Sequence, residues 1–335
     1  MAARALALVE KILAGDEKLS NGWPVAGTVG YDFATAASGV FVDPRGLEEL
    51  AATYRRFTGN REAFEDLAFT RAAVARCRAR PWSGAHDMGV IETRGLSRRF
   101  GSTDAVRQLD LRVRAGEIYG FLGPNGAGKT TAIRMLCGLL RPTAGTIRIG
   151  DVDLAAEPMK VRAMIGLVPD TPPLYDYLTA VEYIGFVASL YRLPAAVRDA
   201  GAERFLSTFG LADRRDDLCK SFSHGMRKKL HLAAMLTVAP RLLILDEPTN
   251  GLDPKSARVL KDVLGEVRDE GATVFFSTHV LATAEQICDR IGILDAGRLL
   301  AEGTLQELRA RDSSESLEDV ILKLTDAATE NHDAG

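Results

Sequence analysis

Cysteine is scarce in this chain of 335 residues, which has four of them and no Cys-x-x-Cys pair. They are Cys77, Cys137, Cys219 and Cys288. Metal sites and disulfide frameworks need paired or closely spaced cysteines, which this pattern does not offer. We therefore expect small buried residues of a protein in a reducing compartment, and neither a zinc site nor a disulfide-stapled fold.

The chain also lacks a large excess of charge of one sign. The formal net charge is −3, whereas a nucleic-acid-binding protein usually shows a strong basic excess. No apolar run approaches the ~20 residues that a helix needs to span a bilayer, and the N-terminus lacks a signal-peptide cleavage pattern. We therefore expect no nucleic-acid partner, and any role at a membrane would require a partner protein.

What the chain does contain is an alternation of strand-like and helical patterns from about Val90 onward. The length of the chain favours two domains. Its composition, with 46% hydrophobic and 26% charged residues, is ordinary for a globular protein. The expected strands are Val90–Thr93, Leu109–Val113, Gly116–Leu122, Thr146–Ile149, Leu242–Leu245 and Thr273–Phe276. Between about Leu167 and Leu236 only helical patterns occur. The predicted fold class is α/β with an inserted helical subdomain.

One stretch fits the phosphate-binding pattern G-x-x-x-x-G-K-[ST] at every fixed position. It consists of Gly123, Pro124, Asn125, Gly126, Ala127, Gly128, Lys129 and Thr130, followed by Thr131. Glycines let the backbone curl so that successive N–H groups point at phosphate oxygens. Lys129 is placed to reach the β- and γ-phosphates, and the Thr130 hydroxyl to ligate Mg²⁺. A helix over Thr131–Leu140 would add the positive end of its dipole.

Two adjacent carboxylates, Asp246 and Glu247, follow the apolar run Leu242–Leu245. Neighbouring side chains of a strand point in different directions, so one carboxylate can face a metal and the next an attacking water. We expect Asp246 to hold Mg²⁺ and Glu247 to polarise or deprotonate the water that attacks the γ-phosphate.

These motifs resemble those of the ATP-binding-cassette (ABC) ATPases, the nucleotide-binding subunits of ABC transporters. Residues Ser223, His224, Gly225 and Met226 stand where that family carries its signature sequence. Asn250–Asp253 matches the D-loop of the family, His279 its switch histidine, and Phe100 the aromatic residue that stacks on adenine. The likeness runs from about residue 89 to residue 325, with the elements in the order of the family.

The resemblance implies a P-loop NTPase fold that binds ATP and Mg²⁺ and hydrolyses ATP. It also implies that a second ATPase subunit, identical or different, supplies the signature and Asp253, so that two ATP molecules lie between two subunits. His224 and Met226 depart from the usual glycine and glutamine. Their backbone N–H donors survive the change, so contacts to the γ-phosphate should persist, while side-chain contacts to ribose stay open.

The largest departure from the family is Asp170, where glutamine is usual. A carboxylate can ligate Mg²⁺ or accept a proton from water, but it repels the γ-phosphate. Together with the run Ser316–Thr325, an acid here resembles the ATPase subunits of ABC-2-type exporters, which implies an integral-membrane permease as partner and a place at the cytoplasmic face of the membrane. The apolar stretch Pro172–Tyr191 is either the docking surface for that permease or the core of the helical subdomain.

The first 87 residues differ in kind from the rest. Parts of residues 9–44 resemble maltooligosyl trehalose synthase, with Glu10 at the position of its general acid. Cleavage of this kind needs a second carboxylate on another strand, and the strands that should precede Glu10 are absent. We expect a small, mainly helical, incomplete segment without glycosidase activity, either the product of a gene fusion or the result of a start site upstream of a true start at Met88.

The expected divisions are 1–87, an ATPase domain over 88–313 with its helical subdomain over about 167–236, and a tail over 314–335. Two other functions stay open. A non-transport ABC protein acting on ribosomes or DNA would usually carry two cassettes or a long coiled coil, and this chain shows neither. A trehalose-forming enzyme would need the missing nucleophile.

Overall fold

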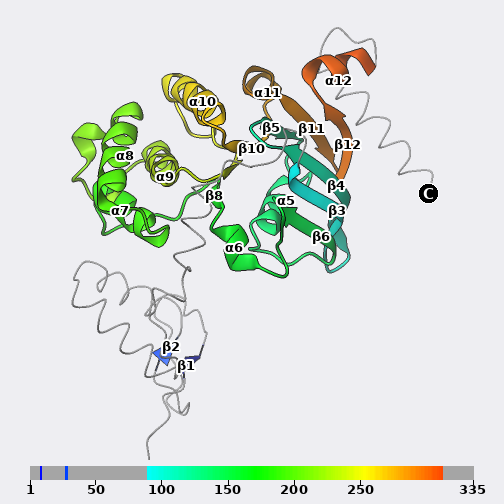
Figure 1. Ribbon diagram of the computed structural model, residues 1–335, viewed down its shortest axis with the longest axis horizontal. Helices are drawn as coiled ribbons and strands as arrows, with labels where there is room; N and C mark the ends of the chain where they lie inside the picture. The colour runs from blue at the N-terminus through cyan, green and yellow to red at the C-terminus, as the bar shows by residue number, and fades with distance from the viewer. Residues whose placement is uncertain (1–7, 10–26, 29–88, 312–335) are drawn as a thin grey trace, which may run out of the picture. The chain divides into compact units, whose positions relative to one another are not determined.

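The computed structural model describes residues 8–9, 27–28 and 89–311 (Figure 1). The chain divides into two units, Met1–Ala68 and Phe69–Gly335. In the first unit the described residues form the strands β1 (Leu8–Val9) and β2 (Gly27–Thr28), which pair in parallel. Glu10, the expected N-terminal helices, Met88 and the tail after residue 311 lie outside the described residues, so the divisions at 87/88 and 313/314 stay predictions.

A six-stranded sheet forms the centre of the second unit, in the order β12-β11-β5-β10-β9-β8. Its strands are β5 (Ile118–Leu122), β8 (Ile165–Val168), β9 (Leu242–Asp246), β10 (Thr273–Thr278), β11 (Arg290–Asp295) and β12 (Arg298–Gly303). Five of them run parallel, and β12 pairs antiparallel with β11. Strands β5, β9 and β10 are buried along their whole length, as their continuous apolar runs predict.

The register of these central strands brings their carboxyl ends to one edge of the sheet. Ser277 of β10 lies beside Asp246 of β9, and Thr278 of β10 lies beside Leu122 of β5. The residues that follow β5, β9 and β10 therefore leave the sheet at neighbouring points. In an open α/β sheet this edge is where ligands bind.

A second, antiparallel sheet has the order β4-β3-β6-β7. Its strands are β3 (Gly89–Phe100), β4 (Thr103–Arg114), β6 (Ala144–Ile149) and β7 (Val152–Asp153). Leu109, Leu111 and Val113 alternate with exposed residues along β4, as expected for a strand with one buried face. The turn between β3 and β4 places Phe100 at the end of this hairpin.

The helices of the described part pack against these sheets or against other helices. They are α5 (Lys129–Leu136), α6 (Pro158–Arg162), α7 (Ala180–Leu190), α8 (Ala195–Thr208), α9 (His224–Val238), α10 (Pro254–Asp269), α11 (Leu281–Ile287) and α12 (Leu305–Arg311), with the 3₁₀ turns Ala212–Arg214 and Cys219–Ser221. Figure 1 shows α7, α8 and α9 grouped on one side of the central strands, with β3, β4 and β6 on the other. Between β8 and β9 all named elements are helical, which confirms the helical insertion. In the described part of the chain, no helix combines the length and the apolar character needed to cross a membrane.

Two apolar clusters make up the core of the second unit, and the central strands contribute alternate residues to each. Phe121 and Phe275 join the cluster that contains Ile133 of α5 and the antiparallel sheet. Phe276 joins the cluster that contains Phe205 of α8 and Leu230 of α9. The helical insertion therefore packs on one face of these strands, and α5 with the antiparallel sheet packs on the opposite face.

The expected bounds of the first helix are wrong at both ends. Helix α5 begins at Lys129, two residues before Thr131, and ends at Leu136. Its end is set by Gly138, whose φ of +66° is left-handed and cannot continue a right-handed helix. Leu139 and Leu140 lie beyond the helix, and Leu139 is exposed.

Candidate nucleotide-binding site

The loop between β5 and α5 contains glycines in backbone conformations that other residues rarely adopt. Gly126 and Gly128 have φ of +85° and +104°, and a Cβ at Gly128 would collide with the carbonyl of Ala105. The N–H of Gly123 donates to the carbonyl of Thr278 at 3.3 Å, which ties the start of the loop to β10. Pro124, Asn125 and Gly126 at its crest are exposed. The loop is therefore held from below and open above, as a phosphate cradle requires.

Lys129 is buried beneath this loop. Its Nζ donates to the carbonyls of Gly123 at 2.5 Å and Pro124 at 3.1 Å, and lies 3.4 Å from Oε1 of Glu247. Thr130 is exposed in the first turn of α5, and Thr131 is half-buried beside it. The ammonium group is thus tethered at the base of the loop, where it can turn toward a bound phosphate.

Asp246 is the last residue of β9, and Glu247 follows it outside the strand. Asp246 is buried, and its Oδ1 accepts a hydrogen bond of 2.6 Å from the hydroxyl of Ser277. The backbone of Glu247 has a φ of +47°, a left-handed conformation that is uncommon outside glycine. Its N–H donates to the carbonyl and the hydroxyl of Ser277 at 3.2 and 3.1 Å. Such backbone strain is characteristic of functional sites and is held here by neighbouring strands.

The Glu247 carboxylate lies between two cationic or potentially cationic groups. Lys129 Nζ is 3.4 Å from Oε1, and His279 Nδ1 is 3.0 Å from Oε2. Both carboxylate oxygens are buried, and neither accepts a hydrogen bond from the residues that the structure describes. A buried acceptor without a hydrogen bond costs folding free energy. This carboxylate is therefore available to accept a proton or a hydrogen bond from a ligand.

The signature residues begin helix α9, as their sequence predicts. The hydroxyl of Ser223 caps the helix by accepting from the N–H of Met226 at 3.3 Å, and His224 is exposed at the first helical position. A Cβ at Gly225 would lie 2.6 Å from the carbonyl of Gly251, so the signature packs closely on the turn before α10. No hydrogen bond or ion pair between residues 89 and 311 joins Ser223–Met226 to Lys129 or Thr130.

Asp253 and Phe100 lie at the borders of the site. Asp253 caps α10, and its carboxylate accepts from the N–H and the hydroxyl of Ser256 at 2.9 and 2.6 Å, which lowers the pKa of that carboxyl. Phe100 is 47% exposed, with the guanidinium of Arg98 4.6 Å from its ring centroid. The contact of Ala105 with Gly128 brings the β3–β4 hairpin next to the phosphate loop.

Two family models match parts of this chain, and its curated relatives are ATP-binding proteins of transport or drug resistance. A family model described as ABC transporter matches residues 106–250, and one described as AAA domain, putative AbiEii toxin, Type IV TA system matches residues 219–283. The daunorubicin/doxorubicin resistance ATP-binding protein DrrA of Streptomyces peucetius is 44% identical over 238 residues, which make up 71% of this chain and 71% of that protein. The bacitracin transport ATP-binding protein BcrA of Enterococcus faecalis is 38% identical, over 67% of this chain and 72% of that protein.

This chain belongs to the ATP-binding subunits of ABC transporters. A solved structure of the ATP-binding subunit of an ABC transporter, 34% identical, superposes with a TM-score of 0.68 over 70% of this chain and 99% of that one. The likeness confirms the predicted P-loop NTPase fold, with ATP as its nucleotide and ATP hydrolysis as its activity. The resemblance of the first 80 residues to maltooligosyl trehalose synthase is not supported by these comparisons.

The ABC subunit holds one further charged residue at this site, which the sequence motifs do not identify. Lys228 of α9 is fully buried, and its Nζ donates to Asp170 Oδ1 at 3.0 Å, to the carbonyl of Glu247 at 2.9 Å and to the carbonyl of Asn250 at 3.0 Å. Its burial could have been predicted from helical spacing, because Lys228 lies on the same face of α9 as the apolar residues Leu232 and Met235. Asp170 is thereby linked to the turn that follows β9.

Proposed function

We propose that this ABC subunit hydrolyses ATP with Glu247 as the general base. The observation that carries the assignment is the buried Glu247 carboxylate, set between Lys129 and His279 without a hydrogen bond from the described residues. In this arrangement Lys129 would turn to the β- and γ-phosphates, His279 would contact the γ-phosphate, and Glu247 would take the proton of the attacking water. Phe100, at the end of its hairpin, would stack on adenine.

We propose Mg²⁺ as the metal that accompanies ATP. The donors at the site are the Thr130 hydroxyl and the Asp246 carboxylate, both oxygen, which is the ligand type that Mg²⁺ prefers. Among the described residues no group of three or more His, Cys, Asp and Glu side chains could hold a metal. This fits an ion bound through one protein carboxylate and substrate phosphates. When bound, it would neutralise charge that develops on the phosphate oxygens.

We propose that a second ATPase subunit completes each site. The N-terminus of the 15-residue helix α9 carries Ser223, His224, Gly225 and Met226. Within residues 89–311, no hydrogen bond or ion pair joins these four residues to Lys129. A partner subunit placed head to tail would bring its signature and Asp253 to the γ-phosphate, supported by the helix dipole. ATP would then close the two subunits and hydrolysis would reopen them.

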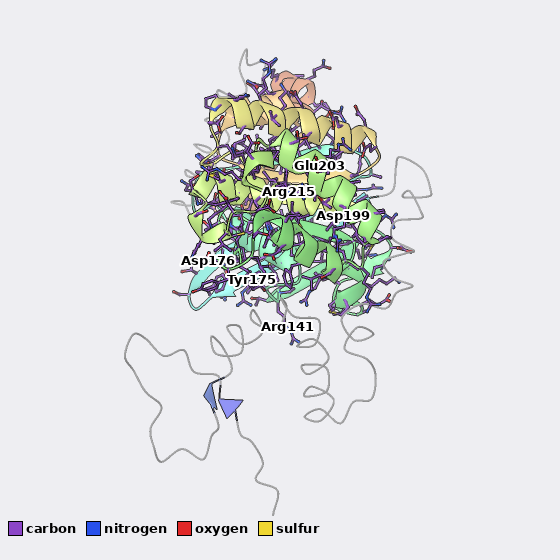
Figure 2. The ribbon with its side chains drawn as sticks, turned by 90° about the vertical axis from the view of Figure 1, so that its left-hand side faces the viewer. Arg141, Tyr175, Asp176, Asp199, Glu203 and Arg215 are labelled. Atoms are coloured by element: carbon purple, nitrogen blue, oxygen red, sulfur yellow. The ribbon has the colours of Figure 1, made fainter. Side chains whose placement is uncertain are left out.

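We further propose that the subunit drives an exporter through an integral-membrane permease, at the cytoplasmic face of the membrane. The names of the relatives DrrA and BcrA refer to drug resistance and bacitracin transport, which supports export. Of the stretch Pro172–Tyr191, the helical part is core, since Tyr183 is buried, whereas Tyr177 is 72% exposed. Figure 2 labels Tyr175 and Asp176 at the lower left of the face formed by the inserted helices. The exposed loop before α7 is therefore our proposed contact with the permease.

The substitution Glu247→Gln tests the catalytic assignment. The amide keeps the size of the side chain but cannot accept the proton of water, so we expect ATP binding to persist while turnover falls at least ~100-fold. We also expect the variant to form dimers when ATP is added, measurable by analytical ultracentrifugation. Turnover close to that of the unaltered chain would refute Glu247 as base. A monomer at every ATP concentration would refute the shared site.

A further inference from the structure

Lys228 is a buried ammonium group whose hydrogen-bonding capacity is fully used. Its side chain is 0% exposed, and its three N–H donors meet three acceptors within 3.0 Å. It has no donor left for a phosphate, so it does not bind ATP in this arrangement. Burying an ammonium is costly, and an apolar side chain of similar length would fill the same space without that cost. The charge of Lys228 therefore acts on its three partners.

Two of these partners belong to the turn that orients Glu247. The Glu247 carbonyl accepts from Lys228 Nζ at 2.9 Å and from the N–H of Asn250 at 3.1 Å, directly beside the strained φ of +47°. The Asn250 carbonyl accepts from the same Nζ at 3.0 Å. Lys228 thus clamps both ends of the turn and helps to maintain a backbone conformation that is unfavourable by itself. The position of the Glu247 carboxylate depends on this turn.

The third partner is the acid that departs from the glutamine of the family. Asp170 Oδ1 accepts from Lys228 Nζ at 3.0 Å and from Nδ2 of Asn250 at 3.4 Å. An isolated carboxylate at this position would repel the γ-phosphate, whereas a carboxylate paired with an ammonium is neutral as a pair. The Asp170 side chain is 48% exposed, whereas Lys228 is buried, so solvent can reach the pair only from the Asp170 side.

We propose that Lys228 is a positioning residue for hydrolysis, which neutralises Asp170 and holds the turn from Glu247 to Asn250 in its active form. The proposal rests on the ATPase role proposed above. Because Lys228 lies on α9, two residues after Met226 of the signature, it connects the position of that helix to the position of the catalytic carboxylate. Disturbing Lys228 should therefore reduce the rate of the chemical step more than it reduces ATP binding.

The test uses the full chain with Lys228→Met, with Lys228→Met combined with Asp170→Asn, and with Lys261→Met as a matched control. Lys261 is a half-buried helical lysine of α10 that makes no hydrogen bond or ion pair within residues 89–311. We expect kcat to fall about tenfold or more in Lys228→Met while KM for ATP changes less than about threefold. Asp170→Asn should restore at least about threefold in that background, because it removes the unpaired carboxylate. Lys261→Met should leave both parameters unchanged.

A second readout, which needs no activity, is hydrogen exchange of the segment 247–252. We expect faster exchange there in Lys228→Met than in the unaltered chain or in Lys261→Met, without a matching change elsewhere in α9. Unchanged exchange, no recovery by Asp170→Asn, or a loss of kcat explained by unfolded protein would overturn the proposal. If the unaltered chain hydrolyses no ATP, the proposed function fails, and exchange alone then decides whether Lys228 holds the turn.

Discussion

At the scale of single residues, burial decides what each ionisable group can do. Lys129, Lys228 and His231 are all buried, yet each faces a different set of partners. Tyr183 lies 2.6 Å from Nδ1 of His231, and the carbonyl of Leu167 lies 3.0 Å from Nε2. Because a carbonyl only accepts, Nε2 carries the proton and Nδ1 accepts from the tyrosine. His231 is therefore a neutral core residue that joins α7 and α9 to β8.

His231 makes the stability of the protein sensitive to acid. Burial lowers the pKa of His231 to about 4, whereas an unfolded chain has about 6.5. The stability that the neutral form contributes is fully present above pH ~6.5 and is lost as the pH falls toward ~4, on the order of 3 kcal/mol in all. We expect His231→Gln to flatten this part of the pH dependence of urea midpoints. The exposed His224, changed to Gln, should keep the original slope; equal slopes in all three proteins would contradict the assignment.

At the scale of elements, continuous apolar runs and glycine spacing predicted the phosphate loop and the strands β5, β9 and β10, whereas β8, β11 and β12 of the same sheet were not predicted. Strands β9 and β10 lie where Leu242–Leu245 and Thr273–Phe276 predict them. The end of α5 was predicted wrongly, because the left-handed φ of Gly138 overrides the apolar residues that follow it. Local sequence identifies an element more reliably than it identifies the residue at which the element ends.

Substitutions at two glycines of the phosphate loop distinguish the cost of backbone strain from the cost of a steric collision. Both Gly126 and Gly128 have positive φ, but only a Cβ at Gly128 would meet another chain segment, at the carbonyl of Ala105. We expect Gly126→Ala to cost about 1 kcal/mol of stability and Gly128→Ala about 3 kcal/mol or more. ATP affinity should fall at least ~10-fold further in Gly128→Ala, since the loop must move to relieve the collision. Urea unfolding and nucleotide titration measure both effects, and an equal loss in the two variants would contradict the collision.

At the scale of the whole molecule, the family match and the site both lie in the second unit. The chain covers 71% of the length of DrrA, and the residues that we assign to ATP extend from Phe100 to His279. Nothing in this set comes from the first 87 residues. The activity is therefore expected to be a property of the second unit.

Removal of residues 1–87 tests this expectation. A chain that begins at Met88 should bind ATP with the affinity of the full chain and hydrolyse it at a similar rate, within about twofold. ATP titration and steady-state phosphate release give the two values, with Glu247→Gln in the shortened chain as the inactive control. Loss of ATP binding on truncation would show that the N-terminal residues are needed for the site.

The sequence alone determined the phosphate loop, the paired carboxylates, the signature and the helical insertion, because each depends on residue types at short, regular spacing. Only the tertiary structure revealed the position of Lys228. Its three acceptors lie 58, 19 and 22 residues away in the chain, on segments that meet only after β8, β9 and α9 have packed. The resemblance to the ABC ATPases identified Asp170 as an acid at a position where glutamine is usual. Packing decided that this acid has a buried counter-ion, since a charge can be buried only where the fold supplies its partners.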